Sequence, residues 1–574
     1  MLSRQRKWTP LAWVSGALLA VLAAVGCFQV GQQASVAAGT EKKAEADPTV
    51  VELTFTYGSE KKSWIEDVTK EFNAAAKKLP DGRTIRVKAI PLGSGECVAE
   101  IFAGRRETHL TSPASSAYVE IGNGRSQKNK EGDLLGKPKY LVRSPVVIAM
   151  WKPMAEALGY GKKPVGWADV LGLVKNDKGW GSVGKPQWGQ FRFGHTHPEH
   201  SNSGLITVLA EVYASTKGKT DGLTADDVKN AAGFLEDIEK GVVHYGESTG
   251  FFADRMFSND VGFLNAAVVY ENLVIESYDR AKYPNAPAEV VAIYPKEGTF
   301  WSDHPVCVVQ RKWVTEAHTK AAEVYSDFLL EEAQQKKAMK HGFRPGVEKI
   351  ELAAPLDKAH GIDPAQPRLI MEVPSNDVME AVIDLWKAHK KPSHINLVID
   401  VSGSMNEEQK LLKAKKGAQD MVGMLGPRDT LSLMVFSTKF TWVKQDVKMD
   451  DKGRKEMTDE IGGLIAQGET ALYDSVLSAY QQLQKGPQSD RITAVVVLTD
   501  GEDNKSKLKT VEELLKEIKF DPEKSPTRVY TIAYGRDANR EVLKKIAEAT
   551  KAKSYDSSDI KTIQAIFKDV AMFF

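Results

Sequence analysis

The chain has 574 residues with 77 Lys and Arg against 76 Asp and Glu, a net charge of +1 that argues against a nucleic-acid-binding role. Its length predicts about three to four domain-sized units, and 27 % charged with 42 % hydrophobic residues is the composition of a soluble globular protein. Three cysteines in this length exclude a disulfide scaffold and a cysteine-rich zinc module.

Residues 1–27 have the pattern of a targeting segment, with a basic start and an uncharged apolar stretch over 11–26. The stretch is short for a spanning helix, which needs about 20 apolar residues, and it ends in Gly26-Cys27. This junction resembles the signal of bacterial lipoproteins, although Ala24 stands where that signal usually has Leu. The resemblance implies a lipid on Cys27; plain cleavage and an uncleaved anchor helix are the alternatives. Each places the remaining chain outside the cytoplasm, and the lipid would hold it at the outer face of the cell membrane.

The next residues, 28–48, are small, polar and charged without apolar periodicity, which predicts a flexible tether. Residues 49–374 alternate short strands with helices, an order typical of a doubly wound α/β sheet. Strands over 140–150 and 290–294 are expected to cross between two lobes. The elements expected at the start of this region are strands over 51–57 and 84–92 and helices over 61–77 and 96–103.

Several stretches of this region carry a family resemblance. They are GSGE over 93–96, SPVVIAMWK over 144–152, SNSG over 201–204, AAVVYENLVI over 266–275 and HGFRPG over 341–346. In pattern and order they resemble bacterial extracellular solute-binding proteins, more narrowly the two-lobed kind that includes molybdate and sulfate binders. The resemblance implies a solute held between two lobes.

A ligand of such a fold lies where strands end and helices begin, because backbone N–H groups and the helix dipole favour anions there. Hydroxyl groups with few cations suit a desolvated oxyanion or a small neutral polar molecule. The same residue types also cap helices and form turns, which is the alternative for each of them. The candidates are Ser59, Ser94, Gly95, Ser115 and Ser116 in the first lobe and Ser201, Asn202, Ser203, Tyr270 and Glu271 in the second.

The stretch GHTHPEH over 194–200 holds three imidazole donors, His195, His197 and His200, beside Glu199. A zinc or nickel site could use side chains at this spacing. Pro198 interrupts any helix here, so pairing on one helical face is not available. The solute-binding resemblance suggests instead that the His-Pro segment is structural.

Two cysteines, Cys97 and Cys307, remain after export. In an oxidising compartment they could pair, and two buried thiols are the alternative. The solute-binding resemblance places both of them in the first lobe.

A connecting segment over 375–392, with a helix over 376–389, is expected to lead into a last α/β domain over 393–574. This domain opens with INLVIDVSGSM over 395–405, whose apolar first half predicts a buried parallel strand. A helix over 407–425 follows, and four of its lysines form a charged face. That face is expected to be solvated, or alternatively to meet an acidic partner. These lysines are Lys410, Lys413, Lys415 and Lys416.

Polar side chains gather at predicted strand and helix junctions of this domain. Asp400, Ser402 and Ser404 leave the first strand, Thr470 precedes a helix over 471–484, and Asp500 ends a strand over 492–498. Carboxylate and hydroxyl oxygens with partial hydration suit Mg²⁺. Open α/β sheets bind ligands at this carboxyl edge.

The D-x-S-x-S sequence, the distant Thr and the T-D-G strand end resemble the von Willebrand factor type A domain and its metal-ion-dependent adhesion site. The resemblance implies that Ser402, Ser404 and Thr470 bind Mg²⁺ or Mn²⁺ directly, and that Asp400 and Asp500 act mainly through water. It also implies an open coordination position that an acidic side chain of a protein partner fills. The expected fold is therefore a two-lobed periplasmic-binding-protein-like α/β domain followed by a Rossmann-like, doubly wound type A domain.

These expectations together favour a non-enzymatic binding protein, tethered to the membrane, that captures a small polar or anionic solute and engages an acidic protein partner through Mg²⁺. The alternative is the substrate-binding component of an ABC-type importer with the type A domain as its docking module. A metal-dependent hydrolase at Asp400 is disfavoured, because neither metal-site motif contains a general base.

Overall fold

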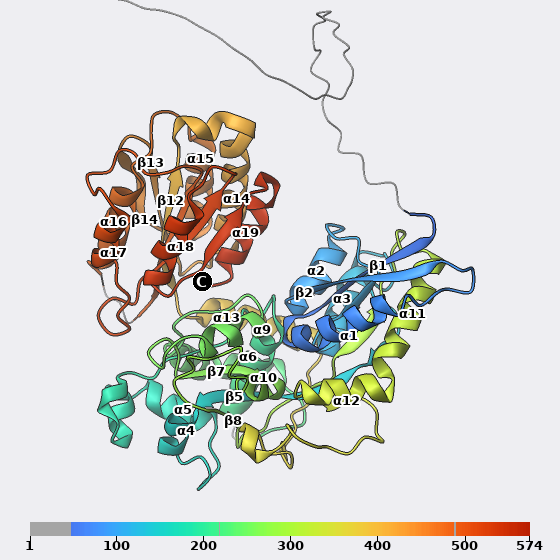
Figure 1. The fold of residues 1–574 in the computed structure, drawn as a ribbon. Coiled ribbons are helices and arrows are strands. Elements are labelled where there is room, and N and C mark those ends of the chain that lie inside the picture. Colours follow the sequence, from blue (N-terminus) through green and yellow to red (C-terminus); the bar gives the residue numbers. More distant parts are fainter. Residues whose placement is uncertain (1–46, 217, 487–489) are drawn as a thin grey trace, which may run out of the picture. The chain divides into compact units, whose positions relative to one another are not determined.

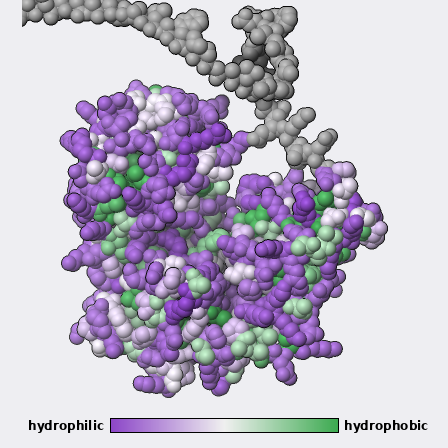
Figure 2. Space-filling view, viewed as in Figure 1, coloured by the Kyte–Doolittle hydropathy of each residue, from purple (hydrophilic) through white to green (hydrophobic). Residues whose placement is uncertain are grey.

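The computed structural model describes residues 47–574 except 217 and 487–489 (Figure 1). The predicted targeting segment, the lipidation predicted at Cys27 and nearly all of the predicted tether lie outside the described residues. In the described part of the chain, no helix combines the length and apolarity needed to cross a membrane. The face drawn in Figure 2 is mostly hydrophilic, with small scattered hydrophobic areas.

The first lobe is built on a five-stranded sheet of order β2-β1-β3-β10-β4. Strand β1 pairs in parallel with β2 and β3, and its buried residues Leu53 and Phe55 lie in one core with Trp64 and Phe72 of α1. The strands are β1 Val50–Gly58, β2 Thr84–Leu92, β3 Leu110–Ser112, β4 Lys139–Tyr140 and β10 Pro305–Val308. The helices are α1 Lys62–Ala74, α2 Ser94–Phe102, α3 Ser116–Lys128, α11 Glu316–Leu330 and α12 Glu332–Lys340.

The second lobe is built on a sheet of order β11-β5-β7-β6, in which β8 and β9 also pair with β5. Its strands are β5 Val142–Trp151, β6 Phe193–Gly194, β7 Ala266–Tyr270, β8 Val290–Ile293, β9 Trp301–Ser302 and β11 Arg344–Pro345. Its helices are α4 Lys152–Leu158, α5 Trp167–Val174, α6 Asn202–Ser215, α7 Ala225–Asn230, α8 Ala232–Glu239, α9 Thr249–Phe257 and α10 Glu271–Glu276.

Of the two predicted crossings between the lobes, the one over 140–150 is confirmed and the one over 290–294 is wrong. The strand expected over 140–150 is two strands, since β4 pairs in the first sheet and β5 in the second. Strand β8 lies wholly in the second sheet, so the stretch 290–294 does not cross. The chain returns between β9 and β10, through Asp303 and His304. Apolar patterning predicts a strand but does not say which sheet the strand joins.

The two lobes are closed on each other. Gly95 N–H at the start of α2 donates to His200 O at 2.9 Å, and Tyr118 Oη donates to Pro198 O at 2.7 Å. Gly250 N–H of α9 donates to Ser59 Oγ at 3.0 Å. A Cβ atom on Gly95 would lie 2.1 Å from Glu199 O, so only glycine allows the backbones to approach this closely.

The last domain has a six-stranded sheet of order β14-β13-β12-β15-β16-β17, with helices on both faces. As predicted, β12 and β15 are parallel neighbours at its centre. Alternate residues of β12 pack on opposite faces: Leu397 lies in one core with α14, α15 and α19, and Val398 in another with α16, α17 and α18. The helix α13 (Asn376–His389) precedes this sheet within the bounds expected for it.

The strands of this sheet are β12 Ser393–Asp400, β13 Thr430–Phe436, β14 Phe440–Lys448, β15 Ile492–Thr499, β16 Arg528–Tyr534 and β17 Ser554–Ser557. Its helices are α14 Lys410–Met424, α15 Asp451–Gly463, α16 Leu472–Leu483, α17 Val511–Glu517, α18 Arg540–Ala549 and α19 Ile563–Ala571.

Cys97 on α2 and Cys307 on β10 are both free and buried in the first lobe. The structure therefore holds two thiols rather than a disulfide. Burial raises the pKa of each thiol to about 12, so neither is a reactive thiolate at neutral pH.

The buried helix α6 carries a carboxyl group that makes stability pH-dependent. Both carboxyl oxygens of Glu211 are buried and have no hydrogen-bond partner among the described residues. Burial, and then the charge of Glu239, raise the pKa of Glu211 well above its usual value. The folded state therefore holds a proton that the unfolded chain releases, and stability falls as pH rises from the unfolded toward the folded pKa.

We expect Glu211→Gln to raise the melting temperature at about pH 8 and to leave it nearly unchanged at about pH 4. Thermal unfolding followed by circular dichroism at both pH values measures this difference. The exposed Glu323→Gln on α11 is the matched control and should shift neither value. An equal gain at both pH values, or no gain at about pH 8, would contradict the assignment of a buried proton.

Candidate functional site

The carboxyl edge of the last sheet gathers the predicted metal residues. Asp400 ends β12, Ser402 and Ser404 follow it, and Asp500 follows the neighbouring strand β15. Ser404 Oγ donates to Asp500 Oδ1 at 2.8 Å and lies 3.1 Å from Ser402 Oγ. Thr470 comes from the loop before α16, and its Oγ1 lies 3.6 Å from the position of a Cβ on Gly501. All five side chains thus reach one edge from three separate segments.

Asp400 is a buried carboxylate held in place by its own loop and by the end of β15. Ser402 N–H donates to its Oδ1 at 2.8 Å and Thr499 Oγ1 donates to its Oδ2 at 2.5 Å. Burial raises the pKa of Asp400 to about 6, although the bonds from Thr499 and Ser402 oppose that rise. A nearby cation would stabilise the charged form of a carboxylate buried in this position.

Lys410 places a cation at the metal edge, whereas the sequence pattern predicted that this lysine faces solvent. It is 4 % exposed, and its Nζ donates to Asp500 Oδ2 at 2.7 Å. The prediction that Lys410 belongs to a solvated charged face is therefore wrong. The reason is local: the single helix expected over 407–425 is a 3-10 segment, Gly403–Gln409, with a kink at Glu408, followed by α14. The kink turns the first residue of α14 toward the metal edge.

The donor set fits a hard divalent cation. It offers three hydroxyl oxygens and two carboxylates, all oxygen ligands, and Ser402, Thr470 and both aspartates are at most 5 % exposed. One oxygen of Asp500 is taken by Lys410, so an ion would share this carboxylate with the lysine. Three neutral hydroxyls leave an ion there short of negative charge, which a carboxylate from outside the domain could supply.

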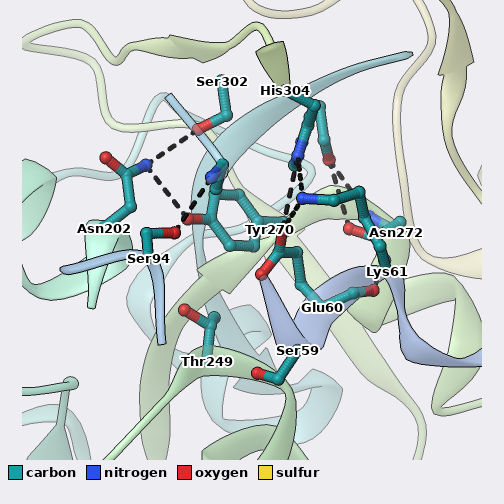
Figure 3. A network of polar contacts seen from close by, with 12 residues as sticks. Ser59, Glu60, Lys61, Ser94, Asn202, Thr249, Tyr270, Asn272, Ser302 and His304 are labelled. Atoms are coloured by element: carbon teal, nitrogen blue, oxygen red, sulfur yellow. Dashed lines mark hydrogen bonds and ion pairs between the residues drawn. The ribbon is translucent and has the colours of Figure 1, made fainter. Parts of the chain in front are cut away.

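The second site is a buried polar network between the two lobes (Figure 3). Asn202 Nδ2, at the start of α6, donates to Tyr270 Oη at 3.0 Å and to Ser302 Oγ at 3.1 Å. Asn272 Nδ2 donates across the lobes to Glu60 O at 3.1 Å, and Thr249 begins α9 in the same view. The first turns of α2, α6 and α9 thus bring polar side chains to one place, as ligand clefts of α/β proteins do.

A charged triad lies inside this network. Lys61 Nζ lies 2.6 Å from Glu60 Oε1 and 3.2 Å from His304 Nδ1, and all three side chains are at most 3 % exposed. Burial would raise the pKa of Glu60, but Lys61 and His304 outweigh it and hold the pKa at about 2. Burial, with Lys61, lowers the pKa of His304. The triad therefore holds one positive and one negative charge at neutral pH.

Two buried polar atoms of the network have no hydrogen-bond partner among the described residues. They are Asn202 Oδ1 and His304 Nε2. Ser112 Oγ, at the end of β3, is one of several further such atoms in the first lobe. Buried polar atoms without partners cost free energy, and a bound molecule would satisfy them.

The nominated solute residues divide between this network and local roles. Ser59, Ser94, Asn202 and Tyr270 belong to the interlobe network drawn in Figure 3. Ser201 and Ser203 are bound to the same network, because the hydroxyl oxygens of both are hydrogen-bonded to Thr249 Oγ1. The remaining three nominated side chains have partners of their own: Ser115 caps α3, Ser116 Oγ donates to Asp303 Oδ2, and Glu271 pairs with Arg344 and Tyr294.

Five residues of the cleft were not predicted from the sequence. Three form the charged triad, Glu60, Lys61 and His304, and two are neutral, Thr249 and Asn272. Glu60 and Lys61 directly follow the nominated Ser59, but charged residues at the start of an amphipathic helix are usually solvated. The signal for His304 is tertiary, because it lies on the return crossing that patterning did not locate.

Comparison with known proteins gives two family matches. Residues 53–344, more than half of the chain, match the family model of the bacterial extracellular solute-binding protein, and residues 394–569 match that of the von Willebrand factor type A domain. Both kinds of domain are typically non-catalytic.

Among solved structures, the sulfate-binding protein SubI from Mycobacterium tuberculosis H37Rv is 18 % identical, with a TM-score of 0.39, over 58 % of this chain and 96 % of its own. A periplasmic thiamin binding protein is 13 % identical, with a TM-score of 0.43, over 59 % and 96 %. A von Willebrand factor type A protein from Catenulispora acidiphila is 21 % identical, with a TM-score of 0.29, over 32 % and 42 %.

Among curated proteins, inter-alpha-trypsin inhibitor heavy chain H4 from Homo sapiens is 31 % identical over 117 residues, which are 19 % of this chain and 12 % of that protein. The chain thus spans only a small part of this curated relative. The family matches and the fold agree with each other and with the order of the two domains. The chain belongs to the bacterial extracellular solute-binding protein family and carries a von Willebrand factor type A domain after it.

Proposed function

We propose that the protein is a receptor outside the cytoplasm, tethered to the membrane, that captures a small polar or anionic solute between its lobes and binds a protein partner through Mg²⁺ or Mn²⁺ at the type A domain. Asn202 Oδ1 and His304 Nε2, two orphaned polar atoms inside a closed polar network, carry the solute half of this proposal. The oxygen-rich edge at Asp400 carries the metal half.

The cleft chemistry favours a solute with both hydrogen-bond donors and acceptors. The first turns of α2, α6 and α9 favour a partial or full negative charge on the solute. Glu60 and Lys61 form an ion pair and together add no net charge to the cleft. A thermal-shift screen of the exported chain against inorganic oxyanions and small polar metabolites tests this half. Micromolar binding, roughly −8 kcal/mol, is expected for one of these classes.

We expect Asn202→Ala to weaken binding of the solute found in that screen by about 5- to 150-fold, equivalent to about 1–3 kcal/mol. The reason is that the change removes a buried acceptor and leaves Tyr270 Oη and Ser302 Oγ without their shared donor. Calorimetry measures the loss. Ser116→Ala, whose hydroxyl bonds Asp303 outside the network, is the matched control; equal losses for both variants would count against this cleft.

The metal half assigns Ser402, Ser404 and Thr470 as direct ligands, with Asp400 and Asp500 acting mainly through water. A partner carboxylate would complete the inner shell, so Mg²⁺ and partner should bind with positive coupling. Two large side chains on segments that reach this edge are exposed, Ile465 at 75 % in the loop before Thr470 and Leu412 at 62 % on α14. Ile465 adjoins Ala466, whose carbonyl accepts from Asn406 Nδ2 in the metal loop. Such apolar groups suit a protein partner.

The second candidate function is that of the substrate-binding component of an ABC-type importer, favoured by the family match over 53–344. The type A domain would then dock the receptor to its importer. Purification of the tethered protein from membranes separates the two, because co-purifying permease subunits support the importer role and other surface proteins support the receptor.

The tether itself rests on Cys27. We expect the mature chain to begin at a lipid-modified Cys27 and to partition with membranes, and Cys27→Ala to release it or leave it unprocessed. Intact mass spectrometry of the membrane fraction measures the amino-terminal modification. An unlipidated amino terminus further along the chain would contradict this anchor and leave both binding sites unaffected.

A further inference from the structure

A turn in the second lobe brings together three side chains that the solute cleft and the type A site do not use. His197, Glu199 and His200 each offer one ligand atom, and these atoms all lie within 4.8 Å of one another. His200 N–H and Ser201 N–H both donate to His197 O, at 3.1 and 3.0 Å, which closes the turn between β6 and α6. A turn rather than a helix makes the cluster, so the Pro198 objection to helical pairing does not apply.

Two imidazoles and one carboxylate form a donor set of zinc sites. Tetrahedral zinc with bonds of about 2.0–2.1 Å needs its ligands about 3.3–3.5 Å apart, so the three side chains must close in slightly. His200 Nδ1 is buried and has no hydrogen-bond partner among the described residues. A cavity of about 400 Å³ adjoins the cluster and is lined by His197, Glu199, His200 and Trp386, which leaves room for a water ligand.

We propose that His197, Glu199 and His200 form a Zn²⁺ site, separate from the Mg²⁺ edge of the type A domain. The site binds one zinc through three side chains, with water in the fourth position.

One neighbouring cation competes with the metal. Lys387 Nζ of α13 donates to Glu199 Oε1 at 2.7 Å, and zinc must displace it. The other two lysines of the cavity have carboxylate partners, since Lys390 pairs with Asp429 at 2.9 Å and Lys568 lies 3.4 Å from Glu100. Zinc binding is therefore opposed by one partly exposed ion pair, which lowers the zinc affinity.

The site would act on lobe closure. His200 O accepts the bonds from Gly95 N–H and Glu96 N–H, and Pro198 O accepts the bond from Tyr118 Oη, all from the first lobe. Asn202, two residues beyond the last ligand, lies in the solute network. Zinc bound at this turn would hold in place the backbone contacts that close the lobes. It would also hold Asn202, a residue proposed to bind the solute.

The test is calorimetric titration of Zn²⁺ into the exported chain carrying Asp400→Asn, which removes the type A edge as a competing site. We expect one zinc per chain. Glu199→Gln should weaken the affinity at least about tenfold, and Lys387→Met should strengthen it, because the competing cation is gone. Both side chains are partly exposed, at 34 % and 41 %, so both variants should fold.

His360→Ala, a histidine that pairs with Asp357 outside this turn, is the matched control and should leave the affinity unchanged. Cobalt substitution should give the visible absorption of a tetrahedral site, and Glu199→Gln should remove it. Unchanged binding in Glu199→Gln, weaker or equal binding in Lys387→Met, or no zinc bound at all would overturn the proposal. None of these outcomes would contradict the proposed solute cleft or the proposed Mg²⁺ site.

Discussion

Asp400→Asn should lower the Mg²⁺ affinity of the exported chain by about 100-fold and abolish partner binding that depends on the metal. The amide keeps the size of the side chain and can still accept from Ser402 N–H, but it removes the charge that the ion needs. Calorimetry of Mg²⁺ binding measures the loss. Asp451→Asn, an exposed aspartate at the start of α15, is the matched control and should bind Mg²⁺ as the unchanged chain does.

The same change should not cost stability. Burial raises the folded pKa of Asp400 from 3.8 to about 6, so the native state loses stability as pH rises from about 4 through about 6. An amide does not titrate and avoids this loss. In the absence of divalent cations at about pH 8, Asp400→Asn should therefore melt at the same temperature as the unchanged chain or higher. A large drop in melting temperature there, or unchanged Mg²⁺ affinity, would show that Asp400 serves the core and not an ion.

Gly95→Ala should prevent lobe closure and weaken solute binding by about 100-fold. The new Cβ would lie 2.1 Å from Glu199 O and 2.9 Å from His200 Cα, both backbone atoms that cannot rotate away. Forcing extra atoms into such a contact costs about 1–3 kcal/mol, and that cost falls only on the closed state. Small-angle scattering should show a larger radius of gyration for the variant, and calorimetry the loss of affinity.

The matched control for this experiment is Gly172→Ala on α5 of the second lobe, where an added Cβ meets nothing within 4 Å. It should close and bind as the unchanged chain does. Each lobe of Gly95→Ala should stay folded, because alanine suits the first turn of α2. A variant that binds solute normally with an unchanged radius would contradict the closed arrangement of the two lobes.

The metal edge could be predicted because its signal is local. The apolar, β-branched runs over 395–399 and 492–498 predicted two buried strands, and the polar residues directly after them had to lie at the same sheet edge. The structure places these strands side by side, as β12 and β15. Thr470 could be nominated only because a family resemblance named a third segment, since spacing alone does not say which loop folds over that edge.

The rest depended on tertiary packing. Lys410 looked like a solvated lysine because four lysines recur along one predicted helix, and only the kink at Glu408 turns it inward to Asp500. The cleft triad joins Glu60 and Lys61 to His304, more than two hundred residues away along the chain. Ser115 and Glu271 had suitable side chains at strand and helix junctions, but both are engaged locally. Ser115 caps α3, and Glu271 forms an ion pair with Arg344.

Anomalous diffraction from crystals of the exported chain soaked in Mn²⁺ tests the metal site most directly. We predict one Mn²⁺ peak at the carboxyl edge of β12 and β15, within about 2.5 Å of Ser402 Oγ, Ser404 Oγ and Thr470 Oγ1, with Asp400 and Asp500 reached through water. A type A domain without Mn²⁺ at this edge, or an ion there with Thr470 well outside its inner shell, would contradict it.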